Sequence, residues 1–172
     1  DVSVYLGDGQ GGLSEKSAFS TGSGANSVAI ADFNGDGLLD LATANGTGDN
    51  ISVLLGDGSG GFSGRADYSV GDGPTAIDAA DANGDGTVDI AVANYSSDNV
   101  SILLGNGDGT FDPSSSYDIG SSASSVDFTD MNGDGRLDLV VARQMSTNVS
   151  VLLGNGDGSF GMHKEYGAGR NP

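Results

Sequence analysis

Short stretches of alternating apolar and polar residues run through the chain, and glycine-rich turns separate them. In NISVLLG (50–56), the alternate positions from 51 onward carry large apolar side chains, as one face of an extended strand requires. No segment shows the 3.6-residue period of an amphipathic helix. The pattern predicts one set of four short strands at 27–33, 38–45, 50–56 and 62–70.

This four-strand pattern recurs with a period of 49 residues. The segments DVSVYLGDGQGGL, NISVLLGDGSGGF, NVSILLGNGDGTF and NVSVLLGNGDGSF are near copies that begin at positions 1, 50, 99 and 148. Such a repeat predicts an all-β chain of β-propeller blades, each made of four antiparallel strands. A β-solenoid or a sandwich is the alternative, but neither explains a strict 49-residue register. The expected divisions are a half blade at 1–26 and blades at 27–75, 76–124 and 125–172.

The composition agrees with hairpins rather than helices. The chain has 31 glycines and 3 prolines, and only Glu15 and Glu165 among its 24 acidic residues are glutamates. Aspartate caps or interrupts helices, so the acidic residues do not decorate a helical surface. A net charge of −18 opposes binding to nucleic acid or to an anionic membrane surface. The chain has no cysteine and no apolar run of membrane-spanning length.

A nine-residue pattern, D-x-N-x-D-G-x-x-D, occurs three times between the first two strands of a unit. Its copies are DFNGDGLLD (32–40), DANGDGTVD (81–89) and DMNGDGRLD (130–138). The first six positions match the calcium loop of an EF-hand, in which side chains at positions 1, 3 and 5 converge on a hard cation. Here an aspartate at position 9 closes the loop and the flanks are strands.

A metal-free hairpin rich in aspartate and asparagine turns is the alternative interpretation of this pattern. Three carboxylates in each loop would repel one another without a cation, and this favours a metal site. Mg²⁺ demands a smaller octahedral site, so the pattern predicts three Ca²⁺ ions.

The motifs DFNGDGLLDLATAN, DANGDGTVDIAVAN and DMNGDGRLDLVVAR, each followed by a strand and a glycine-rich turn, resemble the FG-GAP/VCBS-type repeats. That group includes the integrin α-subunit propeller. The resemblance implies a seven-bladed ring with Ca²⁺ in the hairpin that joins the first two strands of a blade. The implied ligands are Asp32, Asn34, Asp36, the Leu38 carbonyl and Asp40; Asp81, Asn83, Asp85, the Thr87 carbonyl and Asp89; and Asp130, Asn132, Asp134, the Arg136 carbonyl and Asp138.

The resemblance also implies a secreted or cell-surface setting and a non-catalytic module for adhesion, which binds a protein or a glycan. The alternatives are a lectin and the propeller part of a polysaccharide-degrading, lyase-like enzyme. We expect no catalytic residues, because His163 is the only histidine, its equivalents Lys16, Arg65 and Ser114 vary, and no lyase-type cluster breaks the repeat. The aromatic residues that recur at period 49 are expected in the core: Phe62, Phe111 and Phe160, and Phe19, Tyr68, Tyr117 and Tyr166.

The length of the chain bears on its partners. The 172 residues make up three and a half units of 49, which is half of a seven-bladed ring. Two copies would supply the strands of seven blades, although each copy would keep a two-stranded half blade. The sequence therefore predicts either further blades outside these residues or self-association through apolar faces and strand edges.

Overall fold

A computed structural model describes residues 1–144 and 146–169, which form fourteen β-strands and no helix. None of these residues belongs to a helix that could cross a membrane. The strands are β1 (Val2–Val4), β2 (Ser17–Phe19), β3 (Ala25–Ala31), β4 (Asp40–Asn45), β5 (Asn50–Gly56), β6 (Phe62–Ser69), β7 (Pro74–Ala80), β8 (Asp89–Asn94), β9 (Asn99–Leu103), β10 (Ser115–Asp118), β11 (Ala123–Thr129), β12 (Asp138–Arg143), β13 (Asn148–Leu152) and β14 (Lys164–Gly167).

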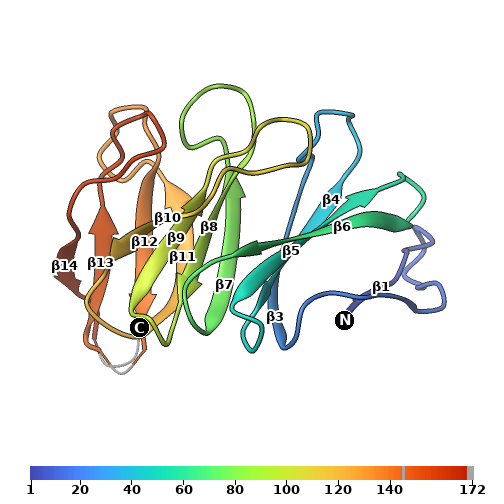
Figure 1. Ribbon diagram of the computed structural model, residues 1–172, viewed down its shortest axis with the longest axis horizontal. Coiled ribbons are helices and arrows are strands. Elements are labelled where there is room, and N and C mark those ends of the chain that lie inside the picture. The colour runs from blue at the N-terminus through green and yellow to red at the C-terminus, as the bar shows by residue number, and fades with distance from the viewer. Residues whose placement is uncertain (145, 170–172) are drawn as a thin grey trace.

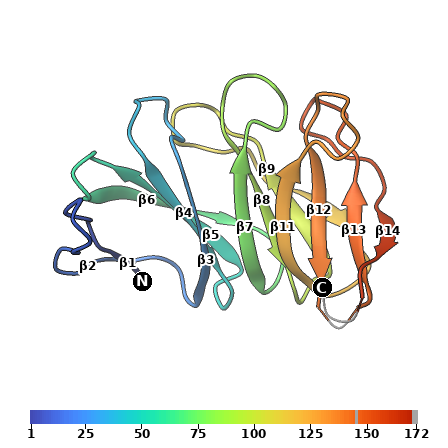
Figure 2. The ribbon, with the colours of Figure 1, turned by 180° about the vertical axis from the view of Figure 1, so that it is seen from behind.

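The strands form three sheets of four and one sheet of two, all antiparallel and in chain order. We call β3–β6 blade 1, β7–β10 blade 2, β11–β14 blade 3 and β1–β2 the half blade. The sheets stand side by side like sections of a fan (Figure 1), and the opposite view shows the same order (Figure 2). The predicted all-β fold of about three and a half propeller blades is confirmed.

The strand boundaries differ from the sequence prediction around the Asp-rich loops. The first strand of blade 1 was expected at 27–33 and lies at Ala25–Ala31, and the second begins at Asp40 instead of at 38. Backbone amides between these strands donate to aspartate side chains instead of to the neighbouring strand. The loop therefore takes two residues from each strand.

The hydrophobic core lies between blades. Ala42, Ala44 and Val53 of blade 1 pack against Ile90 and Val92 of blade 2. A second cluster joins blades 2 and 3 in the same way. Each blade thus has a leading face toward the preceding blade and a trailing face toward the next blade. A blade therefore needs its neighbours to bury the apolar residues of these two faces.

The recurring aromatic residues connect the outer parts of successive blades. Three edge-to-face ring pairs, each between residues 43 positions apart, have centroid separations of 5.2, 5.5 and 5.6 Å: Phe19–Phe62, Tyr68–Phe111 and Tyr117–Phe160. Tyr166, the next residue of the series, is exposed, because no described residue lies beyond blade 3 to cover it. The core location expected for this one member is therefore not found.

A buried polar network recurs in blades 1 and 2, with one difference. Asn45 Nδ2 donates to Asn50 Oδ1 and Ser52 Oγ, and Asn94 makes the two equivalent bonds. Thr43 Oγ1 also donates to Asn45 Oδ1 over 3.1 Å. Val92 replaces that threonine in blade 2, and Asn94 Oδ1 is buried without a partner.

Blade 3 replaces this asparagine with Arg143. Its buried guanidinium donates to Glu165 Oε1 and, over 2.9 Å, to Ser121 Oγ. The hydrogen bond from Arg143 to Glu165 is the main cause of the lowered pKa of Glu165. Because arginine offers only donors, this site differs in chemistry from the asparagine sites.

The orphaned Asn94 oxygen predicts opposite outcomes for the same substitution in two blades. Val92→Thr supplies the missing donor, whereas Val141→Thr, at the equivalent position of blade 3, buries a hydroxyl beside Arg143. Arg143 offers no acceptor for the hydrogen of that hydroxyl, and a buried donor without an acceptor costs about 1–3 kcal/mol. In urea unfolding, we expect Val92→Thr to be at least about 1 kcal/mol more stable than Val141→Thr. Equal stabilities would contradict the assignment of the network.

Candidate metal centre

The three Asp-rich loops are the connections between the first two strands of each blade. They lie at the same end of the three sheets (Figures 1 and 2). Each loop makes its sharp turn at two glycines with positive φ, which are Gly35 (72°) and Gly37 (83°) in the first loop. A side chain is strained in this backbone region, which explains why glycine follows positions 3 and 5 of the pattern.

The first three aspartate and asparagine positions, at 1, 3 and 5 of the pattern, are organised by hydrogen bonds within the loop. In blade 1, Asp32 accepts the amides of Gly35 and Gly37, each over 2.8 Å, and Asn34 donates to Asp36 over 3.0 Å. Asp36 also accepts the Leu38 amide. The loops that begin at Asp81 and Asp130 repeat these bonds. The loop curls with its side-chain oxygens directed inward onto backbone amides.

The closing aspartate of each loop is fully buried and has a role that the motif did not reveal. Asp40 accepts the Phe33 amide over 2.9 Å and the Gly56 amide over 2.7 Å. Asp89 and Asp138 make the equivalent pairs of bonds over 2.9–3.0 Å. Each carboxylate therefore joins the hairpin between the first two strands to the end of the third strand. We call these three residues the clamp aspartates.

The side chain at position 7 also has a structural role. For Leu38, Thr87 and Arg136, only the backbone carbonyls were expected to bind metal. In the structure, these side chains lie over Gly58, Gly107 and Gly156, where an added Cβ would approach them within 2.8–3.1 Å. These three glycines also have positive φ values of 73°, 74° and 81°, so their recurrence did not by itself reveal this contact.

The electrostatics differ between the exposed and buried aspartates. Hydrogen bonds from Thr87 lower the pKa of Asp85, and the Gly135 amide is the main cause of the lowered pKa of Asp130. Burial raises the pKa of the clamp residue Asp89. Hydrogen bonds thus favour the charged form of Asp85 and Asp130, whereas Asp89 is buried at a cost that its two amide bonds offset in part.

The donor set suits a hard cation, because each loop offers only carboxylate, amide and carbonyl oxygens. The structure brings positions 1, 3 and 5 of each loop together through shared amides and places position 9 on the clamp. Within residues 1–144 and 146–169, no three acidic or histidine side chains form a cluster that could hold a metal ion. In the first loop, Asp32 Oδ2 and both carboxylate oxygens of Asp36 each accept one hydrogen bond and keep a further lone pair for a cation. The ligand assignments are predictions.

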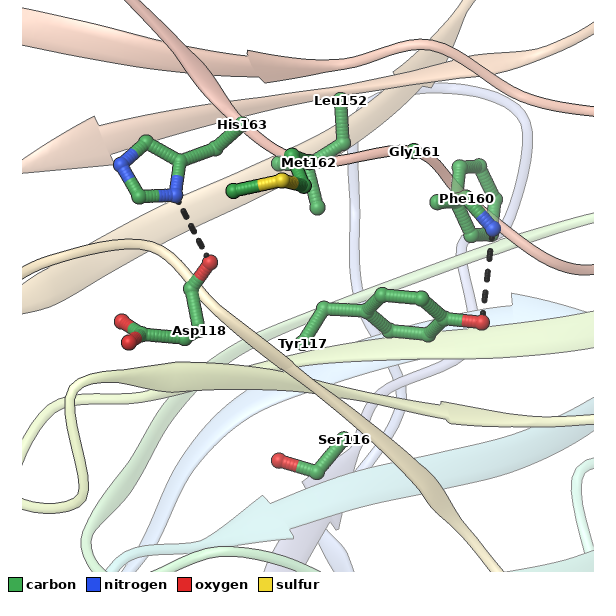
Figure 3. A pocket seen from close by; sticks show the side chains of 8 residues that line it. All are labelled: Ser116, Tyr117, Asp118, Leu152, Phe160, Gly161, Met162 and His163. Carbon is green, nitrogen blue, oxygen red and sulfur yellow. Dashed lines mark hydrogen bonds between the residues drawn. The ribbon is translucent and has the colours of Figure 1, made fainter.

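A second candidate site surrounds His163. A pocket of about 270 Å³ lies between β10 and residues 160–163, beside the Tyr117–Phe160 ring pair (Figure 3). His163 Nδ1 lies 2.9 Å from the Asp118 carbonyl, and in the preceding blade Ser114 Oγ donates to the Ser69 carbonyl. His163 therefore continues a polar link between blades, and the residue is half-buried.

Stacked four-stranded sheets and recurring Asp-rich hairpins define a repeat protein of the β-propeller class. The FG-GAP-like repeat model matches residues 1–43, 32–92, 81–141 and 130–172, so the chain belongs to that family. The family resemblance seen in the sequence is thereby confirmed.

A solved structure of another protein agrees with the fold. A lectin from Agrocybe aegerita that specifically recognises non-reducing terminal N-acetylglucosamine matches with a TM-score of 0.62 and 21% identity, over 96% of this chain and 46% of that chain. A chain of the Photorhabdus luminescens Tc holotoxin pore matches more weakly, with a TM-score of 0.47 and 18% identity, over 81% of this chain and 7% of that chain. No curated protein sequence matches significantly.

The clamp predicts which aspartates stabilise the folded chain in the absence of metal. In EDTA, Asp40→Ala leaves two backbone amides without their acceptors, and we expect a loss of about 2–5 kcal/mol in unfolding free energy. Asp36→Ala removes an exposed carboxylate from the same loop, and we expect a loss below about 1 kcal/mol. Chemical denaturation of both variants checks this, and similar losses would refute the clamp's special role.

Proposed function

We propose that this chain is a calcium-stabilised, non-catalytic propeller module that binds a glycan or protein ligand outside the cell. The observation that carries the calcium assignment is the threefold repetition of one oxygen-only donor set with the same internal hydrogen bonds. A bound cation would offset the repulsion among the three carboxylates of each loop.

The residues that would hold calcium in each loop are those at positions 1, 3, 5, 7 and 9. Bound calcium would supply positive charge against a net charge of −18 and would stabilise the folded state by mass action. The glycines and the aspartate–amide hydrogen bonds of each loop hold its backbone in the curled conformation before calcium binds. An extracellular location is part of this proposal, because calcium sites of low affinity are occupied only where the calcium concentration is high.

Two observations support an interaction function over catalysis. The family fold presents loops and inter-blade grooves on a rigid frame, where recognition residues are commonly carried. The one histidine already bonds to a backbone carbonyl in a structural series. The similarity to a lectin that recognises N-acetylglucosamine favours a glycan as the ligand class.

The calcium assignment predicts three sites that can be removed one at a time. Calorimetric titration of the EDTA-treated chain should give a stoichiometry of three, and Asp32→Ala should reduce it to two. The matched control is Asp57→Ala, because Asp57 also accepts two local amides but lies in another turn. That variant should keep three sites. Absence of calcium binding, or no rise in melting temperature on adding calcium, would contradict the assignment.

The ligand assignment is tested by a glycan array that includes terminal N-acetylglucosamine. We expect saturable binding by the calcium-loaded chain and unchanged masses of the same oligosaccharides after prolonged incubation. Shortened or unsaturated products would contradict the non-catalytic assignment. Failure to bind any glycan would overturn the glycan class in favour of a protein ligand.

A further inference from the structure

The two ends of the fan expose faces that are buried elsewhere in the same chain. We propose that two copies of the chain associate head to tail, with the trailing face of blade 3 in one copy covered by the half blade of the other. This assembly does not depend on the calcium assignment. It extends the inter-blade contact that already occurs three times within the chain.

The trailing face of blade 3 has the composition of a blade interface. A surface pocket of about 470 Å³ is lined there by Val140, Val149, Val151, Leu153 and Tyr166, among others. The equivalents of the first three residues in blade 2 are Ala91, Val100 and Ile102, which are at most 1% exposed because blade 3 covers them. The face is therefore formed as an interface and lacks only the next blade.

The half blade supplies the matching face. Tyr5 is 49% exposed and Leu13 is 70% exposed. Their equivalents on the leading faces of blades 2 and 3 are buried against the preceding blade: Leu103 and Leu152 for Tyr5, and Phe111 and Phe160 for Leu13. Large exposed apolar side chains at repeat positions that are otherwise buried indicate a contact surface.

The repeat also sets the register of the contact. Tyr68 packs on Phe111 and Tyr117 packs on Phe160, so Tyr166 is placed to receive Leu13 of a second copy. A backbone contact can be extended in the same way. The Gly109 amide donates to the Phe33 carbonyl of the preceding blade. The equivalent pair across the proposed interface is Gly11 and Met131.

A second copy is the occupant that these observations favour. A second copy carries the leading face that would follow blade 3 in the repeat. Each copy has one exposed leading face and one exposed trailing face, so two identical contacts between these faces can close a ring. The chain covers 46% of the structurally similar lectin chain, so two copies approach the length of that fold. Because each copy carries a net charge of −18, the association should strengthen as salt screens repulsion.

The mass of residues 1–172 in solution tests the proposal. In 0.5 M NaCl, sedimentation equilibrium should give about 34 kDa, twice the chain mass of 17.0 kDa. Leu13→Asp and Tyr166→Asp should each raise the dissociation constant at least about thirtyfold, as expected for central interface residues. Met162→Asp alters a side chain that is 92% exposed and lies on neither face, and it should leave the mass unchanged. Circular dichroism checks that all three variants remain folded.

Mixing the two weakened variants distinguishes head-to-tail contact from other arrangements. A mixed pair keeps one interface with both native residues, Tyr166 of one copy and Leu13 of the other. An equimolar mixture should therefore recover a species of about 34 kDa that neither variant forms alone. A wild-type chain that stays at 17.0 kDa, or a mixture without the larger species, would overturn the proposal.

Discussion

One buried carboxylate in each blade holds together the elements on which the rest of the structure depends. Asp40, Asp89 and Asp138 each accept one amide from the Asp-rich loop and one from the end of the third strand. A buried charge is costly unless it is well hydrogen-bonded, so the cost of misplacing any of these amides is high. This constraint fixes the loop relative to the sheet and leaves the other loop oxygens exposed at one end of the fan, where a cation could reach them.

The blades also depend on one another. Apolar residues from two neighbouring sheets make up each core cluster, and the recurring ring pairs cross the same boundary. In such a linear array, stability comes from contacts between neighbours as much as from each unit alone. The exposed apolar residues at the two ends are the repeat equivalents of residues that are buried between blades elsewhere in the chain. Fold stability and the proposed association therefore depend on the same repeated interface.

Much of this architecture could be predicted from the sequence, because the strict 49-residue period displays strands, turns and Asp-rich loops three times over. The second role of the Asp40 position could not be predicted, since position 9 suits a metal ligand and a buried acceptor equally well. The packing of Leu38 on Gly58 depends on a turn 20 residues away. The pairing of Arg143 with Glu165 and the orphaned Asn94 oxygen arise where single blades depart from the repeat, and only the fold shows what lies beside them.

Amide hydrogen exchange, followed by NMR in EDTA, tests the clamp most directly. The account predicts that the amides of Phe33, Ala82 and Met131 and of Gly56, Gly105 and Gly154 exchange as slowly as those of the central strands. The amides of Gly37, Gly86 and Gly135, held only by exposed loop carboxylates, should exchange much faster. If the clamp amides exchange as rapidly as the loop amides, the buried aspartates do not hold the blades together, and the account is contradicted.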